Sequence, residues 1–228
     1  VMGGLAFGLT RLLRLGRRAT ATVLIVAMFV NGGNYGMTLL QLRYGDDGLA
    51  RGVVFYVTST VLLYTVGLLI ASLGHLPWRE ALGRMARLPA FYAAILAVIV
   101  YRFDITVPAP LMAGITVAGS GAIPLMLLVL GMQIAEMRRG EPVGFVWPVV
   151  GLRLVGGPLI GLAVAAALGL SGIARSSMII EASMPTAVFT LIVAAEFGLP
   201  TSAVGRIVVI TTLISPLTIA ATISLLGL

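Results

Sequence analysis

Cysteine is absent from the sequence, and histidine occurs only once, as His75. Without cysteine the chain can form neither disulfides nor cysteine-held iron–sulfur clusters. A structural zinc site needs four Cys or His ligands, and a catalytic zinc site needs three protein ligands. We therefore predict a chain with no metal site and no bound cofactor.

Charged residues are also scarce. They make up 10% of the chain, against 59% hydrophobic residues, and the mean hydropathy is +1.10. A soluble domain carries about 25% charged residues, so this chain cannot coat a water-facing surface and belongs in a lipid bilayer. All 15 basic residues are arginine and the net charge is +7. Because they lie singly or in short groups between apolar runs, they are typical of membrane anchors, and we expect no nucleic-acid partner.

The apolar runs predict a set of spanning helices. A spanning helix needs about 20 apolar residues, and seven runs meet or approach this length: residues 20–42, 53–73, 88–101, 107–134, 143–170, 176–197 and 203–228. Residues 1–10 are apolar but too short to cross, which is typical of the end of a further span. Barrel strands alternate between apolar and polar residues and these runs do not, so we predict an all-α polytopic membrane protein.

The arginines predict which side faces the cytoplasm. Counted by alternation of sides, eleven fall on one side and four on the other. The first group is Arg11, Arg14, Arg17, Arg18, Arg79, Arg84, Arg87, Arg138, Arg139, Arg153 and Arg206, and the second is Arg43, Arg51, Arg102 and Arg175. Cytoplasmic loops are rich in basic residues. The first side, with the loop at residues 74–87, is therefore predicted to be cytoplasmic in a multi-pass protein of the cell (inner) membrane.

Two pairs of spans mirror one another. Residues 20–42 form a span interrupted by polar residues and are followed by a plain span at 53–73. Residues 176–197 form a span interrupted by proline and are followed by a further span at 203–228. The two interrupted spans cross the membrane in opposite directions. This pattern predicts an inverted repeat, in which corresponding broken helices point to the binding site.

The repeat sets the expected domain organisation. Residues 1–74 are predicted to be the C-terminal part of a first repeat: the end of helix 3, broken helix 4 and helix 5. Residues 75–87 form a cytoplasmic loop, and residues 88–228 form a second repeat with helices 6–10, of which helix 9 is broken. Matching halves would make the chain an N-terminally truncated piece of a ten-span, 5+5 inverted-repeat protein. The alternative is a natural seven-span protein.

The first interruption carries the most informative residues. Residues 31–36 read Asn-Gly-Gly-Asn-Tyr-Gly. Each glycine weakens a helix by about 1 kcal/mol relative to alanine, and an interrupted helix exposes N–H groups and the positive end of its dipole. Such an end favours anions, so Asn31, Gly32, Asn34 and Gly36 are candidate binding residues. The alternative is a close helix contact in which asparagine hydrogen-bonds between helices.

The second interruption pairs a carboxylate with a proline. Pro185, between Met184 and Thr186, removes a backbone donor and clashes with the preceding turn, and Glu181 lies one turn earlier on the same face. A carboxylate within a span is a functional-site hypothesis. Glu181 is a candidate coupling group that binds a proton or a cation such as sodium, or pairs with a positive group. The alternative is that it lies close enough to the outer surface to reach water.

Three other polar residues have competing interpretations. Gln133 fits an interfacial residue better than a ligand. Arg153 is expected to extend its guanidinium to the cytoplasmic surface, with pairing to an anion as the alternative. Residues 118–121 (Ala-Gly-Ser-Gly) resemble the nucleophile stretch of intramembrane rhomboid-type proteases, with Ser120 as the nucleophile. A nucleophile needs a base within hydrogen-bond reach, and the single histidine, His75, falls in a loop away from any span. This disfavours the protease, which we keep, with a scaffold subunit, as the third hypothesis.

Taken together, these residues resemble one family. The Asn-Gly-Gly-Asn-Tyr-Gly run is similar to the N-x-G-N-x-G segment of the auxin efflux carrier family, which comprises plant PIN-type carriers and bacterial malate/malonate permease-like transporters. Further stretches are similar in order and spacing: 123–125 with 131–133, Arg153 followed by Pro158, and 182–187 ahead of 196–198. The chain departs from the family at Thr38, where proline is usual, so the first break rests on glycine and asparagine alone.

The resemblance implies a fold and a function. It implies ten helices in two inverted repeats, with two crossing broken helices that form the site. It also implies a secondary carrier, not an enzyme, that moves small organic anions such as malate, malonate or auxin-like weak acids by alternating access. Its partners would be the anion, the lipid bilayer and a second copy in a homodimer. A sodium-coupled bile-acid-type symporter of related architecture is the alternative. The predicted substrate-binding set is Asn31, Gly32, Asn34, Gly36, Thr38, Gln133, Met184, Pro185 and Thr186.

Overall fold

The computed structural model describes residues 1–74, 89–136 and 144–228, and this part of the chain is helical apart from short connections. Its elements are α1 (Met2–Leu12), α2 (Arg17–Met28), η1 (Gly32–Gly36), α3 (Met37–Leu62), η2 (Leu63–Gly67), α4 (Leu68–Leu73), α6 (Pro89–Arg102), α7 (Ala109–Glu136), α8 (Val146–Gly151), η3 (Leu152–Gly156), α9 (Gly157–Ala167), α10 (Gly172–Ala182), α11 (Phe189–Glu196) and α12 (Thr201–Leu226). The three η elements are π-helical turns within, or at the start of, longer helices. The predicted all-α fold is confirmed.

Three helical stretches among the described residues are long and apolar enough to cross a bilayer: Gly32–Leu73, Val146–Ala167 and Thr201–Leu226. Large apolar side chains on the last two face outward, among them Leu159 and Leu217. Extensive exposed apolar surface suits lipid and not water. These stretches and the all-helical fold identify a polytopic membrane protein.

The structure corrects the start of the second predicted span. α3 consists of two helices that meet at Gly45, where φ is 63° and ψ is −147°, a conformation that glycine adopts without strain. The second helix therefore begins at residue 46 and continues through η2 and α4 to Leu73. We predicted a start at Val53 because residues 53–73 form a run without charged side chains. The charges instead occupy the exposed first turns, where Arg51 and Asp47 form an ion pair of 3.7 Å.

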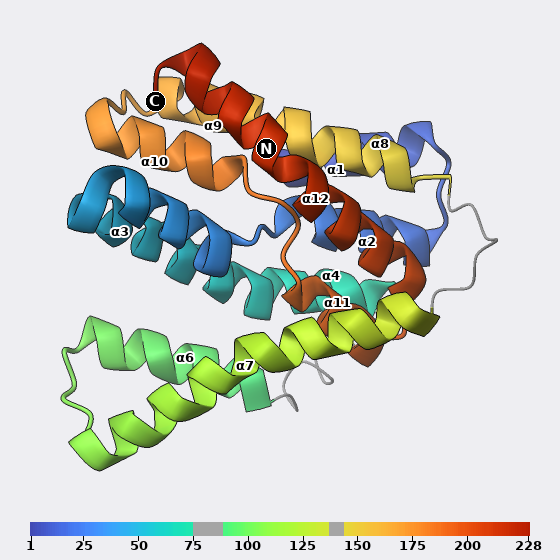
Figure 1. Ribbon diagram of the computed structural model, residues 1–228. Coiled ribbons are helices and arrows are strands. Elements are labelled where there is room, and N and C mark those ends of the chain that lie inside the picture. The colour runs from blue at the N-terminus through green and yellow to red at the C-terminus, as the bar shows by residue number, and fades with distance from the viewer. Residues whose placement is uncertain (75–88, 137–143) are drawn as a thin grey trace.

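Two clusters of buried apolar side chains hold the helices together. The larger one joins α2, α4, α8, α11 and α12, and includes Val26, Leu68, Val149, Leu191 and Ile207. The smaller one joins α10 to α3, α9 and α12, and includes Leu40, Ala165, Ile180, Met184 and Ile219. Figure 1 shows α10 between α9 and α3, with α6 and α7 at one edge of the molecule. α10 is thus enclosed by helices from distant parts of the sequence.

The two interrupted spans cross at their interruptions, as predicted. α2 and α10 end before the breaks, and η1 and α11 begin after them. Between them the chain is extended and pairs with itself: Asn31 N–H donates to Pro185 O at 2.8 Å, and Ala187 N–H donates to Phe29 O at 3.0 Å. The bridge between Val30 and Thr186 is antiparallel, so the two spans run in opposite directions through the crossing (Figure 1).

Candidate functional site

The helices that lead into the crossing, α2 and α10, present their last carbonyl groups there. The final carbonyls of a helix have no intrahelical donor and carry the negative end of its dipole. Thr186 supplies one donor, because its Oγ1 hydroxyl donates to Val26 O at 2.9 Å. Arg153 supplies two, donating from Nη1 to Ala27 O at 2.7 Å and from Nη2 to Ala182 O. Side chains of the protein therefore hold the carbonyl ends of both helices.

The position of Arg153 contradicts the prediction that its guanidinium reaches the cytoplasmic surface. Only 2% of the residue is exposed. The prediction considered only two environments for the guanidinium, the lipid interior and the membrane surface. The negative ends of two helices provide a third environment within the protein, and it is favourable to a cation. No carboxylate in the described part of the chain forms an ion pair with Arg153. Removing it from the eleven arginines assigned to the cytoplasmic side leaves ten against four, and the predicted orientation is unchanged.

The helices that leave the crossing, η1 and α11, present their first N–H groups. These groups lack acceptors within the helix and carry the positive end of the dipole. The first hydrogen bond within η1 is donated by the Gly36 N–H to Asn31 O at 3.2 Å. The N–H groups that precede Gly36 in η1 therefore have no acceptor within this turn. Near α11, the Thr186 N–H is accepted by Thr211 Oγ1 at 3.3 Å. The crossing thus separates two negative helix ends from two positive ones.

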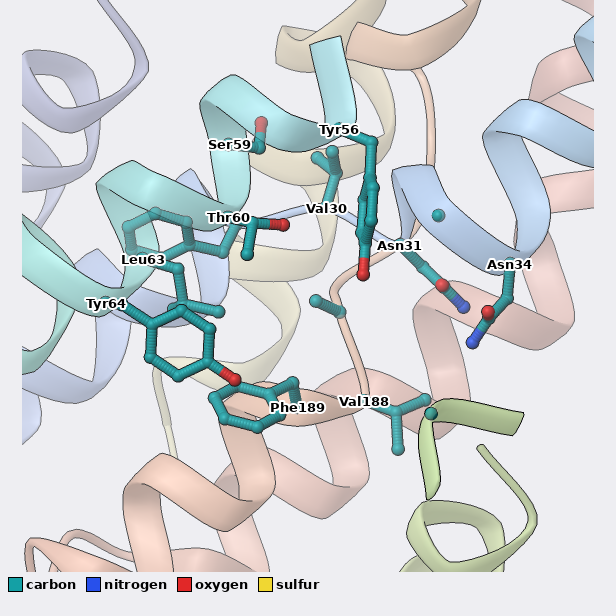
Figure 2. Close-up of a pocket in the computed structure, with 14 residues that line it drawn as sticks. Val30, Asn31, Asn34, Tyr56, Ser59, Thr60, Leu63, Tyr64, Val188 and Phe189 are labelled. Carbon is teal, nitrogen blue, oxygen red and sulfur yellow. The ribbon is translucent and has the colours of Figure 1, made fainter. Parts of the chain in front are cut away.

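A cavity of about 320 Å³ lies against the positive ends. Its lining comes from both breaks, from the helix after Gly45 and from α7: Phe29, Val30, Asn31, Gly33, Asn34, Tyr56, Ser59, Thr60, Leu63, Tyr64, Gly119, Ala187, Val188 and Phe189. Figure 2 shows the side-chain amides of Asn31 and Asn34 pointing toward one another at one end, and Tyr64 beside Phe189 at the other. Ligand pockets typically enclose about 300–1,000 Å³, so the cavity suits a small organic molecule.

Aromatic rings form much of the cavity wall. Tyr64 and Phe189 meet edge to face, with ring centroids 5.3 Å apart. The ring of Tyr56 rests on Gly33, where an added Cβ would lie 2.6 Å from Tyr56 Cε2, so only glycine permits this contact. None of the described lining residues is Arg, His, Asp or Glu. An anion in this cavity would therefore be held by backbone N–H groups and side-chain amides instead of a cationic side chain.

The predicted residues of the first break divide between two faces of η1. Asn31 and Asn34 line the cavity. Gly32 and Gly36 are buried on another face, against Glu181. Thr38 lies outside the cavity and is exposed, and its Oγ1 donates to Asn34 O at 2.8 Å. Only the two asparagines of this group therefore combine a polar side chain with access to the cavity.

The predicted residues of the second break support the crossing but do not line the cavity. Met184 is fully buried in the smaller apolar cluster, and Pro185 and Thr186 form the paired backbone of the crossing. The lining residues here are the next ones along the chain, from Ala187 to Phe189. Gln133 falls on α7, and its side chain lies outside the described part of the structure.

Sequence reasoning missed the side of the cavity that the helix after Gly45 provides. Tyr56, Thr60 and Tyr64 all line it. They recur every four residues, which places them on one face of a helix. A polar and aromatic face within an otherwise plain apolar span was the signal that could have identified them.

Glu181 lies behind η1, away from the cavity. It is 0% exposed and sits one residue before the end of α10, so the interpretation in which it reaches water at the membrane surface is wrong. The break after α10 places its carboxylate deep within the molecule, where neither oxygen has a hydrogen-bond partner among the described residues. Glu181 is not among the residues that line the cavity.

The protease hypothesis gains nothing from the structure. Ser120 lies on an exposed stretch of α7 and donates to Thr116 O at 2.8 Å, as serines within helices commonly do. His75 lies outside the described residues. A nucleophile needs a base within hydrogen-bond reach, and the described part of the chain contains no histidine near Ser120.

Comparison with known proteins identifies relatives across most of the chain. The family described as membrane transport protein matches residues 78–223. An uncharacterized transporter of Methanothermobacter thermautotrophicus is 28% identical over 193 residues, which cover 84% of this chain. An uncharacterized transporter of Methanocaldococcus jannaschii is 25% identical over 207 residues, or 87% of this chain. A probable auxin efflux carrier component 5c of Oryza sativa subsp. japonica is 31% identical over 144 residues, or 60% of this chain.

The relatives are longer than the chain. The matched region covers 63% of the Methanothermobacter protein, 66% of the Methanocaldococcus protein and 39% of the rice protein. The chain therefore spans less than two thirds of the length of each of these relatives. The resemblance to the auxin efflux carrier family, drawn from the motifs, is confirmed by these matches.

Proposed function

We propose, from the premise that the chain belongs to the membrane transport protein family (the auxin efflux carrier family that its motifs resemble), that it forms the core of a secondary carrier for small organic anions. The substrates are carboxylates such as malate, malonate or auxin-like weak acids. One observation carries the proposal: two antiparallel broken helices cross beside a cavity, and the positive end of η1 and the amides of Asn31 and Asn34 meet there.

The geometry suits a carboxylate with an organic body. The carboxylate binds at the N-terminal end of η1, where orphan N–H groups and the helix dipole favour a negative charge. Asn31 and Asn34 donate from their side-chain amides. The organic body of the substrate lies against the aromatic wall formed by Tyr56, Tyr64 and Phe189. Because no cationic side chain is required, the anion is held by dipoles alone, which allows release on the opposite side of the membrane.

Transport requires that the cavity open to each side in turn. Carriers built on inverted repeats achieve this by moving one bundle against another around a fixed site. We assign the crossing, with α2, η1, α10 and α11, to the moving transport domain. The matched relatives are longer than this chain, and we assign the scaffold in part to the segments that the match does not cover.

The predicted setting of the carrier follows from charge. We expect the protein in the cell (inner) membrane, with the loop at residues 74–87 facing the cytoplasm, because ten of the fourteen remaining arginines are assigned to that side. A homodimer formed through the scaffold fits the family. Glu181 is the candidate coupling residue, for a proton or for sodium.

Uptake into vesicles tests the proposal. The full-length protein is reconstituted, and the initial uptake of labelled malate, malonate and indole-3-acetate is measured for wild type and for Asn34→Ala. A hydrogen bond to a charged group contributes about 1.5–3 kcal/mol, so the variant should take up the transported anion about 10- to 100-fold more slowly at low substrate concentration.

Gln41→Ala is the matched control for this experiment. Gln41 carries the same amide group on an exposed part of α3, outside the cavity, so its removal should leave uptake unchanged. Equal uptake by Asn34→Ala and wild type would remove the site assignment. Absence of uptake of every labelled carboxylate by wild type would overturn the proposed substrate class.

A further inference from the structure

The short helix η1 separates two different environments. Its Asn31–Asn34 end lines the cavity through Asn31, Gly33 and Asn34. On another face, Gly32 and Gly36 lie directly against the Glu181 carboxylate: a Cβ added at Gly32 would be 2.6 Å from Glu181 Oε2. One turn of helix therefore has the proposed anion site on one side and a buried carboxylate on the other.

The Glu181 carboxylate lies against three glycines. Besides the two glycines of η1, Gly52 of α3 approaches it, since a Cβ there would be 3.3 Å from Glu181 Oε1. The residue is 0% exposed, and neither oxygen accepts a hydrogen bond from the described residues. Burying an ionised carboxylate without a partner is energetically costly. Packing alone therefore does not explain why a glutamate occupies position 181.

Among the described residues, no charged side chain pairs with Glu181. The elements packed against α10 carry these ionisable side chains: Tyr35 on η1; Arg43, Tyr44, Asp46, Asp47, Arg51 and Tyr56 on α3; Arg153 on η3; and Arg206 on α12, while α10 itself carries Arg175. No ion pair or hydrogen bond of the described residues joins any of them to Glu181. Arg153, whose guanidinium lies at the crossing, is bound to the carbonyls of Ala27 and Ala182.

We propose that Glu181 is a proton-binding site linked to anion binding through η1, so that the carrier takes up a proton together with its substrate. This inference rests on the proposed function. An ionised Glu181 and a bound carboxylate would both lie at the positive end of η1, from different sides, and they repel one another. Protonation, in which the carboxylate takes a proton from water and becomes a neutral acid, removes the repulsion. Anion binding and proton binding therefore favour each other.

The expected coupling is measurable. Two unit charges on opposite faces of one helix are roughly 10 Å apart. At an effective dielectric constant of about 20, such a pair alters affinity on the order of tenfold. By reciprocity, a bound anion raises the proton affinity of Glu181 by the same factor.

The surroundings fit a proton better than a metal cation. A hard cation needs a shell of several oxygen ligands. Six backbone carbonyls at the crossing each accept a hydrogen bond from the protein, which competes with metal binding at these oxygens: those of Val26, Ala27, Phe29, Glu181, Ala182 and Pro185. The residues known to lie against the carboxylate of Glu181 are Gly32, Gly36 and Gly52, which have no side-chain oxygen to add to a ligand shell. A proton needs only the carboxylate itself.

Binding measured at two pH values tests the linkage. The probe is whichever of labelled malate, malonate or indole-3-acetate the uptake assay shows to be carried, and it is measured with the full-length protein at pH 6.5 and 8.5, where these carboxylates are largely ionised. Wild type should bind several-fold more weakly at the higher pH, by at most the full coupling of about tenfold. Glu181→Gln, which resembles the protonated acid, should keep the tighter affinity at both. Glu196→Gln, a matched change at an exposed glutamate of α11, should retain the wild-type pH dependence.

Proton uptake by wild type provides a second measurement that needs no variant. In weakly buffered solution, saturating anion should draw up to about half a proton per protein from the medium for a tenfold coupling, and replacing sodium with choline should change nothing. A pH dependence that persists in Glu181→Gln, a lack of proton uptake, or a loss of binding in choline would each overturn the linkage and leave the carrier proposal intact. Failure of wild type to bind any of the three probes would instead overturn the carrier proposal, and the linkage with it.

Discussion

Arg153 shows how a single residue can fix a crossing of two helices. Its guanidinium is planar and presents several donors in a fixed geometry. Two of these reach carbonyls at the ends of different helices, Ala27 O on α2 and Ala182 O on α10. The positive charge lies where two negative dipole ends converge. The residue therefore binds the first half of one broken span to the first half of the other.

Replacement of Arg153 by lysine keeps the charge but not the bridge. A single ammonium cannot reach both carbonyls from the geometry of a guanidinium, so one buried carbonyl loses its charged donor. We expect Arg153→Lys to lower the free energy of unfolding by about 1.5–3 kcal/mol, seen as a fall of about 3–12 °C in the thermal midpoint of the purified protein. Arg51→Lys is the control, because its side chain is 42% exposed and surface ion pairs contribute little. An equal midpoint for both variants would show that the bridge is not stabilising.

At the scale of an element, α12 tolerates a proline within its helix through a local substitute. Pro216 has no N–H to donate to Thr212 O, four residues before it. The hydroxyl of the preceding residue replaces it, since Ser215 Oγ donates to Thr212 O at 2.9 Å. Ser215 is 0% exposed, so water cannot take over this role. The pair Ser215–Pro216 thus forms one unit.

A double-mutant cycle tests this unit. Ser215→Ala leaves the Thr212 carbonyl without a donor and should cost about 1 kcal/mol, or roughly 2–4 °C in the thermal midpoint. In a Pro216→Ala background the restored N–H can donate to the same carbonyl, so the same serine change should cost much less. Equal costs in the two backgrounds would mean that the serine hydroxyl does not compensate for the proline.

The two broken elements also show what the sequence could and could not predict. The positions of the two breaks could be predicted from the sequence. Residues 31–36 contain glycines and asparagines, the second break contains Pro185, and these residue types disfavour a continuous helix through local effects. The first break forms even though Thr38 stands where the family usually has proline. The reason is tertiary: the extended residues pair with the other break through the Asn31 N–H and the Ala187 N–H, which no local pattern contains.

Residues that act through distant neighbours were the ones that sequence reasoning misplaced. Arg153 was assigned to the membrane surface because its two acceptors lie 126 and 29 residues away in the chain. The tyrosines at positions 56 and 64 were overlooked because their span carries no break or charge, although their spacing places them on one face. Glu181 could be identified as unusual but not located, because its burial depends on three glycines from two other elements.

At the scale of the whole molecule, the arginines and the helix directions together define an orientation. The connection between α1 and α2 and the bend of α3 at Gly45 lie at opposite ends of the molecule (Figure 1). The first end carries Arg14, Arg17 and Arg18, whereas the bend carries two aspartates, Asp46 and Asp47. Basic residues are retained on the cytoplasmic side of a membrane. The first end is therefore expected inside the cell and the bend outside.

The absence of cysteine from these 228 residues makes this orientation testable with single thiols introduced into them. Gly16→Cys lies at the arginine-rich end, at an exposed position where an added Cβ meets nothing within 4 Å, and Asp46→Cys lies at the exposed bend. A membrane-impermeant maleimide added to spheroplasts should label Asp46→Cys at once and Gly16→Cys only after the membrane is permeabilised. Because one broken span separates the two positions, labelling of both before permeabilisation would contradict a transmembrane path between them, and the reverse order would invert the orientation. The reverse order would place the loop at residues 74–87 outside the cytoplasm and contradict the charge argument. Labelling of both positions would mean that the crossing between them does not lie within the bilayer.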